Sequence, residues 1–372
     1  MTGSGGTSNA GFIENRATHH GGQVSTKAPR SQLGAPTIAD VAAAAGFSPM
    51  TVSRVINGEK SVRESTRNAI NSAIAKLNYS PNLAARTLAG ADQIRIGLLY
   101  SNPSAAYLSR FLLGSLEQAR LSHIQLVIEK CDGGSADEED ALRELIASGV
   151  DGIILSPPLC DSALILAQLE ESGIPTVVVA NWRPPGNVSV VRIDDHEAAS
   201  AMTRYIAALG HTRIGFIIGI PTHKASEQRL NGFLATMRDL GLATPDELIV
   251  QGQFTYRSGL TAAEALLDLP ERPTAIFASN DDMAAATVSV AHRRHLDVPS
   301  DLTVCGFDDT DFAQSIWPEL TTIHQPIAEM SRTAVEMLVR RIRTRRSGRD
   351  EPVQEALLDF TLIRRASDAA MA

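Results

Sequence analysis

The feature that most constrains the fold of this chain is an alternation, from Ile94 onward, of short apolar runs with longer helical patterns. The runs are five to seven residues long and rich in β-branched residues, which is typical of strands buried on both faces. Several of the intervening helical patterns end at a glycine. The alternation predicts an α/β fold built on doubly wound parallel sheets. The predicted strands are 94–100, 124–129, 152–156, 175–180, 188–193, 213–219, 274–279 and 302–307.

The length of this α/β part predicts two lobes. About 280 of the 372 residues follow residue 92, which is too many for one sheet of this kind. We therefore expect residues 93–372 to form two lobes with the chain crossing between them near residues 193 and 320. The first lobe is expected at about 93–193 and 320–345, and the second at about 194–319 with the C-terminal strand.

Residues 35–80 predict a small all-α domain. Gly46 and Phe47 separate two short helical patterns, and glycine favours the left-handed backbone of a tight turn. Ser48 is a favoured N-cap and Pro49 a favoured first helical residue, so a second helix is expected to begin there. The layout is that of a helix-turn-helix, with a plain helical hairpin as the alternative. The residues expected to lead or face outward on the second helix are Ser48, Pro49, Met50, Thr51, Ser53 and Arg54, and Arg54 could bind guanine or phosphate.

The charge is distributed unevenly along the chain. Residues 1–92 carry nine Lys and Arg against five Asp and Glu, a net charge of +4, whereas the whole chain carries -8. The acidic excess therefore lies in the α/β part, and the N-terminal part is mildly basic, as binding to phosphates requires. Residues 1–34, rich in Gly, Ser, Thr and Ala, predict a disordered tail. The arginine-rich run at 340–349 is expected to be a solvated helix end rather than a second DNA-binding element.

Other classes of protein are disfavoured by what the sequence lacks. Three widely spaced cysteines, Cys131, Cys160 and Cys305, give no CxxC pair, so we expect no disulfide framework and no structural zinc. No apolar run approaches the ~20 residues of a membrane span, and no export signal is recognisable, which favours the cytoplasm. The GxSxG, GxxxxGK[ST], GxGxxG and HExxH motifs are all missing, so we expect no enzyme, cofactor or catalytic metal.

Two long patterns identify a family resemblance. Residues 37–57 read TIADVAAAAGFSPMTVSRVIN, and residues 67–88 follow the pattern R-x-x-I-x-x-A-I-x-x-L-N-Y-x-P-N-x-x-A-R-x-L. Further matching runs are GHTRIGFI, RLNGF, RPTAIFASNDDMA, VCGFDDT and LTTIHQP. In these runs the sequence resembles the LacI/GalR family of bacterial transcription regulators. Only the N-terminal tail lies outside the resemblance.

The resemblance implies how DNA would be bound. In that family the first helices bind a DNA half-site, and Pro49, Met50 and Arg54 fall where the recognition helix meets bases. Residues 81–92 would form a hinge helix that enters the minor groove, with Leu88 as an apolar wedge at the central base step. A hinge helix this short is not expected to be stable without DNA. The other residues implied in DNA contact are Asn57, Asn82, Ala85 and Arg86.

The resemblance also implies a ligand cleft between the lobes of a periplasmic-binding-protein-like fold. The implied ligand residues are Tyr107, Arg229, Phe254, Asn280 and Asp308, for which core packing of Phe254 and a capping role of Asn280 or Asp308 are the alternatives. Many relatives place an aspartate after the strand at 175–180, where Asn181 is the nearest polar residue of this chain and, with a one-residue shift, would be a further ligand residue. His223 and Ser226, in the loop before Arg229, could line the cleft or lie in solvent.

These residue types suit a sugar, because amides, carboxylates and arginine bind hydroxyls and an aromatic face covers the C–H side of a ring. We therefore expect a sequence-specific DNA-binding transcriptional regulator, most simply a repressor, that binds a pseudo-palindromic operator as a homodimer. A purine or other corepressor remains an alternative effector, and the sequence leaves induction and corepression both open. A periplasmic-type sugar-binding protein is the more distant alternative, because it would have no helix-turn-helix.

Overall fold

The computed structural model describes residues 36–56, 62–79, 93–131, 135–182, 184, 186 and 188–371. The chain divides into two units, Met1–Ala91 and Asp92–Ala372. The predicted tail, the hinge segment and Asn57 lie outside the described residues. No helix in the described part of the chain is long and apolar enough to cross a membrane.

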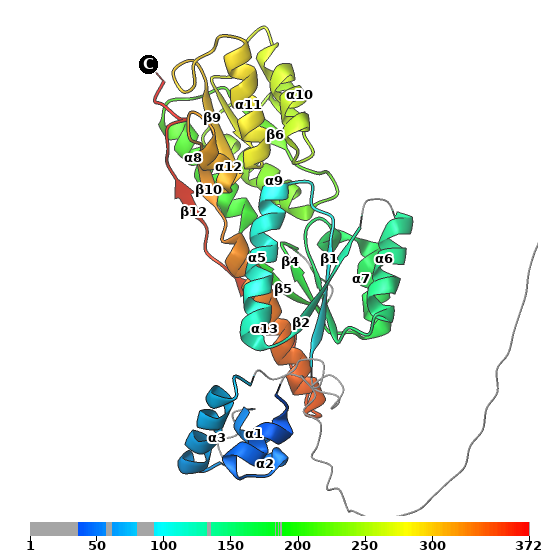
Figure 1. Cartoon of the computed structure of the whole chain (residues 1–372). Helices are drawn as coiled ribbons and strands as arrows, with labels where there is room; N and C mark the ends of the chain where they lie inside the picture. The colour runs from blue at the N-terminus through cyan, green and yellow to red at the C-terminus, as the bar shows by residue number, and fades with distance from the viewer. Residues whose placement is uncertain are drawn as a thin grey trace, which may run out of the picture. The chain divides into compact units, whose positions relative to one another are not determined.

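The N-terminal unit contains three helices, α1 (Ile38–Ala45), α2 (Pro49–Ile56) and α3 (Glu64–Lys76), which are labelled in Figure 1. A capping box between Thr37 and Asp40 starts α1, and Gly46, in the left-handed region at φ 76°, ends it. The turn predicted at Gly46 is thus present. The three helices enclose one small apolar core made of Val41, Ala42, Val52, Val55, Ile70 and Ala73.

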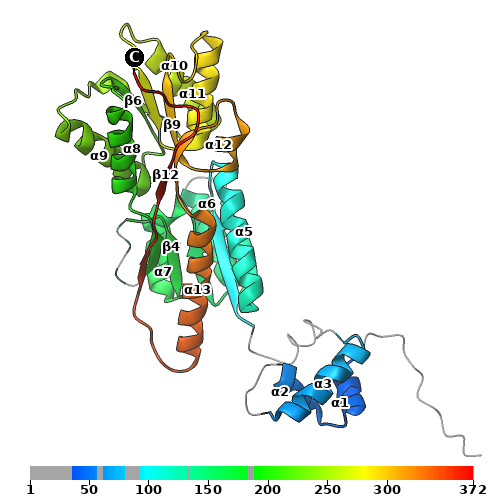
Figure 2. The same cartoon turned by 90° about the vertical axis from the view of Figure 1, so that its left-hand side faces the viewer.

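The first lobe of the larger unit is a six-stranded sheet in the order β11-β5-β4-β3-β1-β2. Helices α5 and α13 lie side by side on one face, and α6 and α7 cover the other (Figures 1 and 2). The strands are β1 (Arg95–Tyr100), β2 (Gln125–Lys130), β3 (Gly152–Leu155), β4 (Thr176–Val179), β5 (Ser189–Arg192) and β11 (Glu355–Leu357). The helices are α5 (Ala105–Ser122), α6 (Ser135–Ala147), η1 (Leu159–Asp161), α7 (Ala163–Ser172) and α13 (Ile327–Arg346).

The second lobe is a six-stranded sheet in the order β12-β10-β9-β8-β6-β7, in which only β12 runs antiparallel to its neighbour. Helices α8 and α9 lie on one face and α10 and α11 on the other (Figure 2). The strands are β6 (Ile214–Ile218), β7 (Ile249–Gln251), β8 (Ala275–Ala278), β9 (Thr303–Asp308), β10 (Thr321–His324) and β12 (Thr361–Ile363). The helices are α8 (Asp195–Ala208), α9 (Lys224–Asp239), η2 (Asp246–Leu248), α10 (Tyr256–Leu267), α11 (Asp281–Arg293) and α12 (Asp311–Ser315).

All eight predicted strands are present, and the doubly wound α/β architecture is confirmed. The chain leaves the first lobe after β5, as expected, but it returns later than residue 320. Residues 321–324 form β10, which pairs in register with Cys305–Asp308 of β9 and so belongs to the second lobe. A further crossing follows β11, which pairs with β5 in the first sheet. The placement of 320–324 in the first lobe was therefore wrong, because this short run extends the second sheet before the chain enters α13 at Ile327.

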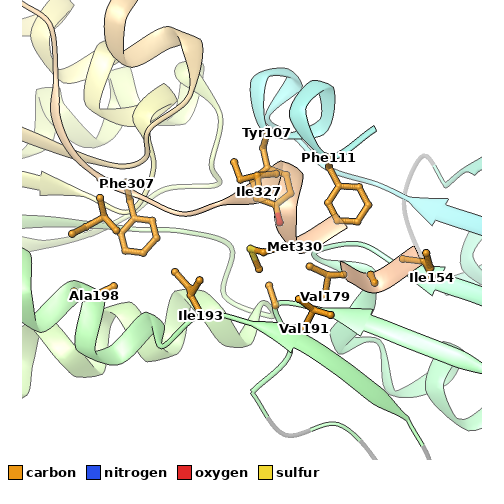
Figure 3. Close-up of a cluster of buried hydrophobic side chains, with 14 of the residues drawn as sticks. Tyr107, Phe111, Ile154, Val179, Val191, Ile193, Ala198, Phe307, Ile327 and Met330 are labelled. Atoms are coloured by element: carbon orange, nitrogen blue, oxygen red, sulfur yellow. The ribbon is translucent and has the colours of Figure 1, made fainter. Parts of the chain in front are cut away.

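The two lobes share one apolar core at their junction (Figure 3). Ile193 lies where β5 leaves the first sheet, and Ile327 and Met330 lie in the first turn of α13. They connect Tyr107 and Phe111 of the first lobe with Phe307 of the second. Because side chains of both lobes pack in this cluster, a change in the angle between the lobes must be accommodated here.

The arginine-rich end of α13 binds its own lobe. Arg343 donates to the carbonyl oxygen of Ser122 at 3.0 Å, and Arg345 donates to that of Gly173 at 2.6 Å. These carbonyls lie at the C-terminal ends of α5 and α7, where helices leave acceptors unsatisfied. Arg346 pairs with Asp151 at 2.8 Å. These arginines hold helix ends in place, which supports the interpretation of this run as a solvated helix end.

Candidate DNA-binding surface and effector cleft

Helix α2 presents one buried and one exposed face. The Ser48 hydroxyl oxygen accepts a hydrogen bond from the Thr51 backbone N–H at 3.2 Å, so it caps the helix that Pro49 begins. Val52 and Val55 are buried against the other helices, whereas Met50 is 67 % exposed. Ser48, Pro49 and Arg54 are also exposed, and Thr51 and Ser53 are half-buried. This arrangement leaves the start of α2 accessible, as a recognition helix requires. Asn57, Asn82, Ala85, Arg86 and Leu88 lie outside the described residues.

A cleft lies between the two lobes of the larger unit. Its walls are loops and first helical turns that follow the carboxyl ends of the parallel strands, where ligands bind in sheets of this type. The first lobe contributes Asn102, Pro103, Ser104, Tyr107, Pro157, Pro158 and Ala180. The second lobe and the connection after β10 contribute Ile220, His223, Arg229, Phe254, Asn280, Asp308 and Gln325.

The cleft brings together six of the eight predicted ligand residues. Asn181 and Ser226 are the two that it does not contain. The Asn181 amide donates to the Cys160 carbonyl oxygen at 2.7 Å and to Asp161 Oδ1 at 2.8 Å. Ser226 is buried in α9, and its hydroxyl has no hydrogen-bond partner among the described residues. Neither side chain lines the cleft, so the expectation that they do was wrong.

Arg229 brings a positively charged side chain to the wall of the cleft, and the residue is only 4 % exposed. Its Nε donates to Asp195 Oδ1 at 2.8 Å, and its Nη1 donates to the Ser279 carbonyl oxygen at 2.6 Å. Asp308 Oδ1 lies 3.7 Å from the same Nη1, and the guanidinium stacks on Phe307 at 3.6 Å. Two carboxylates therefore surround one guanidinium, whose orientation is fixed before any ligand arrives.

Asp308 and Tyr107 both line this cleft, and the pKa of each is raised by its surroundings. Burial raises the pKa of the Asp308 carboxyl well above its usual range, although the charge of Arg229 acts in the opposite direction. Gln325 Nε2 donates to Asp308 Oδ1 at 2.5 Å. Burial, together with the charge of Asp308, also raises the pKa of the Tyr107 phenol. The phenol is therefore protonated, and its buried hydroxyl has no hydrogen-bond partner in the described part of the chain.

Backbone strain is concentrated in the same cleft. Ala180, Phe254 and Asp308 have φ angles of 62°, 58° and 108°, in the region that non-glycine residues rarely adopt. Such conformations persist where surrounding structure imposes them, and they are typical of ligand sites. Phe254 also depends on Gly219, since a Cβ at that position would lie 2.0 Å from the ring.

Asn280 combines a cleft position with a capping role. Its Oδ1 accepts from the Met283 backbone N–H at 3.0 Å, and its Nδ2 donates to the Phe254 carbonyl oxygen at 3.0 Å. It thus starts α11 and holds the strained Phe254 backbone, which is the alternative that the sequence left open.

Sequence reasoning missed four polar residues at the lobe junction. Asn102, Ser104 and Gln325 line the cleft, and Asp161 lies directly beside it. Ser104 Oγ donates to Asp282 Oδ2 of the other lobe at 2.7 Å. Asn102 and Ser104 could have been identified from the sequence because they follow directly after the predicted strand 94–100.

Cys160, Asp161 and His223 form a buried group whose potential ligand atoms lie within 4.8 Å of one another. These residue types can bind a metal ion. In the structure, however, Asp161 accepts hydrogen bonds from His223 Nδ1 and from the Cys160 thiol. Burial, followed by the charge of Asp161 and this hydrogen bond, raises the pKa of the thiol. The potential ligand atoms of these residues therefore already form hydrogen bonds with one another, and a metal ion would have to displace the protons of those bonds.

Comparison with known proteins identifies the family of the chain. Residues 37–82 match the model for bacterial regulatory proteins of the lacI family, and residues 203–367 match that for a periplasmic binding protein-like domain. The ribose operon repressor of Escherichia coli (strain K12) is 33 % identical over 309 residues, covering 82 % of this chain and 93 % of the repressor. The chain belongs to the lacI family. It is therefore a DNA-binding transcriptional regulator, and the family resemblance is confirmed.

Two further lacI-family proteins show how far the similarity extends. The HTH-type transcriptional repressor PurR of Photobacterium profundum is 32 % identical over 308 residues, covering 82 % of this chain and 92 % of that protein. A solved structure of the Lac repressor dimer bound to operator and the anti-inducer ONPF is 27 % identical, with a TM-score of 0.71, and covers 90 % of this chain and 99 % of that one. The match extends over both units of this lacI-family chain.

Proposed function

We propose that this lacI-family protein is a repressor whose affinity for operator DNA is controlled by a sugar bound between its lobes. The proposal of an effector in the cleft rests on the buried hydroxyl of Tyr107, which has no hydrogen-bond partner among the described residues. A buried donor without a partner costs free energy, and a ligand oxygen would remove that cost. Tyr107, His223, Arg229, Phe254, Asn280 and Asp308 are the proposed effector-binding residues.

The charges of the cleft favour an uncharged effector. Arg229 is already paired with Asp195 and lies near Asp308, so it offers no unneutralised positive charge to a phosphate or carboxylate. An anionic ligand would instead meet the carboxyl group of Asp308, which lines the cleft. A neutral polyol can accept from Tyr107 and donate to the Asp308 oxygens, while Phe254 covers its apolar face. A purine acting as corepressor is the second candidate, and it rests on the similarity to the repressor named PurR.

For DNA binding we propose that the start of α2 enters the major groove. Ser48, Pro49, Met50, Thr51, Ser53 and Arg54 would contact DNA there, with Asn57, Asn82, Ala85, Arg86 and Leu88 following. Two copies in a homodimer would place their recognition helices one helical turn apart, ~34 Å, on a pseudo-palindromic site. The similar Lac repressor is a dimer on its operator. Operator DNA lies in the bacterial cytoplasm, which is where we place this protein.

Two experiments test the proposal. In vitro selection from random duplexes with the full chain should yield a pseudo-palindrome with half-sites about 10 base pairs apart. A thermal-shift screen of monosaccharides, disaccharides, sugar phosphates and purine bases should give its largest stabilisation with a neutral sugar, since a ligand at 100 times its Kd adds about 2.7 kcal/mol. Stabilisation by purines alone would replace the sugar with the purine corepressor. A selected pool without dyad symmetry would contradict the dimeric operator.

A further inference from the structure

Asp161 of the first lobe reaches into the second lobe. Its Oδ2 accepts a hydrogen bond from His223 Nδ1 at 2.6 Å and another from the Lys224 backbone N–H at 2.8 Å. Its Oδ1 accepts from Asn181 Nδ2 at 2.8 Å. The Asp161 and His223 side chains are 3 % and 6 % exposed. A carboxylate that ends η1 in one lobe is thus a buried acceptor for the other.

The bond to Lys224 caps a helix across the lobe boundary. His223 is the N-cap residue of α9, but its side chain makes no capping bond to that helix. The first N–H groups of a helix have no partner within it, and a carboxylate near them is favourable. Asp161 fills this role from the first lobe, so the cap exists only while the lobes are together.

The bond to His223 fixes the proton on its ring. An ionised carboxylate can only accept, so Nδ1 must carry the hydrogen. In the neutral ring the other nitrogen, Nε2, is then an acceptor. His223 lines the cleft beside Phe254, at 6.1 Å between ring centroids. Nε2 has no hydrogen-bond partner within the described ranges, so it remains available to a ligand.

We propose that Asp161 is a positioning residue for effector recognition: in the arrangement of the lobes seen here it holds His223 so that Nε2 offers one hydrogen-bond acceptor to a hydroxyl of the effector. This inference rests on the proposed effector cleft and deepens it. Recognition by His223 therefore depends on how the lobes are arranged, because the acceptor and the group that orients it belong to different lobes.

The orientation of His223 is tested by NMR on the full chain labelled with 15N-histidine, without effector or DNA. A chelator is included because Cys160, Asp161 and His223 could otherwise take up stray zinc. The His223 signals, assigned by their loss in His223→Gln, should show the proton on Nδ1. In Asp161→Asn the amide can donate to Nδ1, so the proton should move to Nε2. Asp140→Asn, which alters an exposed carboxylate paired with Arg143 on α6, should leave the tautomer unchanged.

The cap is tested by hydrogen exchange of the same proteins. The first turn of α9 should exchange about fivefold faster in Asp161→Asn than in the wild type, which corresponds to the loss of one helix cap. In His223→Gln it should exchange as in the wild type, because Asp161 still caps the helix. Should Asp161→Asn fail to fold, the wild-type tautomer and the His223→Gln exchange still decide the matter.

A wild-type His223 with its proton on Nε2, or exchange in α9 that is unaffected by Asp161→Asn, would overturn the inference. Neither measurement uses effector or operator, so their failure would leave the proposed function standing. Conversely, a sugar screen without a hit would count against the proposed effector and leave the tautomer and the cap as measured.

Discussion

Replacing Gly219 by alanine should displace the aromatic wall of the cleft while leaving its polar groups in place. The added Cβ would lie 2.0, 2.3 and 2.6 Å from Cζ, Cε1 and Cε2 of Phe254. Carbon atoms in contact are about 3.5–4.0 Å apart, so the ring has to move by about 1.5 Å. Phe254 is buried and its backbone is held at φ 58°, which leaves little room for that movement.

The expected cost of Gly219→Ala is about 1–3 kcal/mol of unfolding free energy, the usual range for overpacking a core. Affinity for the neutral sugar found in the screen should fall at least about fivefold, since aromatic contacts contribute about 1 kcal/mol. Urea denaturation measures the first quantity and isothermal titration calorimetry the second. Gly186→Ala is the matched control, because a Cβ there meets nothing within 4 Å.

A double substitution separates the clash from other effects of alanine. Leucine lacks the three ring atoms that the new Cβ would meet, so in a Phe254→Leu background Gly219→Ala should cost almost nothing. If Gly219→Ala is as stable and binds as tightly as Gly186→Ala, Phe254 does not occupy the position on which the cleft is built. If the cost persists in the Phe254→Leu background, the clash is not its cause.

Three other predictions concern charge and DNA. Burial raises the pKa of Asp281 to about 7, so the unfolded state loses its proton first as pH rises and stability should fall between about pH 4 and pH 7. The unfolding free energy of the wild type minus that of Asp281→Asn should therefore be larger at pH 5 than at pH 7.5. A difference that is the same at both pH values would refute the raised pKa of Asp281. Arg54→Ala should weaken binding to the selected operator by about 1–3 kcal/mol, measured by fluorescence anisotropy, and unchanged affinity would remove Arg54 from the interface. Leu88→Ser should weaken operator binding more than binding to a random duplex, whereas equal losses would exclude an apolar wedge.

The parts of the fold that the sequence predicted are those with a strong local pattern. The eight strands that the sequence predicted are apolar runs that can be recognised without knowledge of their neighbours. Strands β7 and β11 are only three residues long and contain exposed polar positions, so their pairing with β6 and β5 depends on tertiary contacts. The return of the chain after β10 was misplaced for the same reason.

The site could be predicted to the level of position but not of orientation. Arg229 and Asp308 follow from family motifs, and both line the cleft. Asn181 also follows a strand, yet its amide turns away to Cys160 and Asp161. Asp161 has no motif, because its partners His223 and Lys224 lie more than sixty residues later in the other lobe. Hydrogen bonds between lobes leave no periodic signal in the sequence.

A ligand in the cleft should control the binding of this protein to operator DNA. The most direct measurement is the affinity of the full chain for its selected operator at fixed salt, with and without a saturating concentration of the neutral sugar. The sugar should change the operator affinity by about 5- to 150-fold, and operator should change the affinity for the sugar by the same factor. An operator affinity that stays the same while calorimetry shows the cleft filled would contradict it.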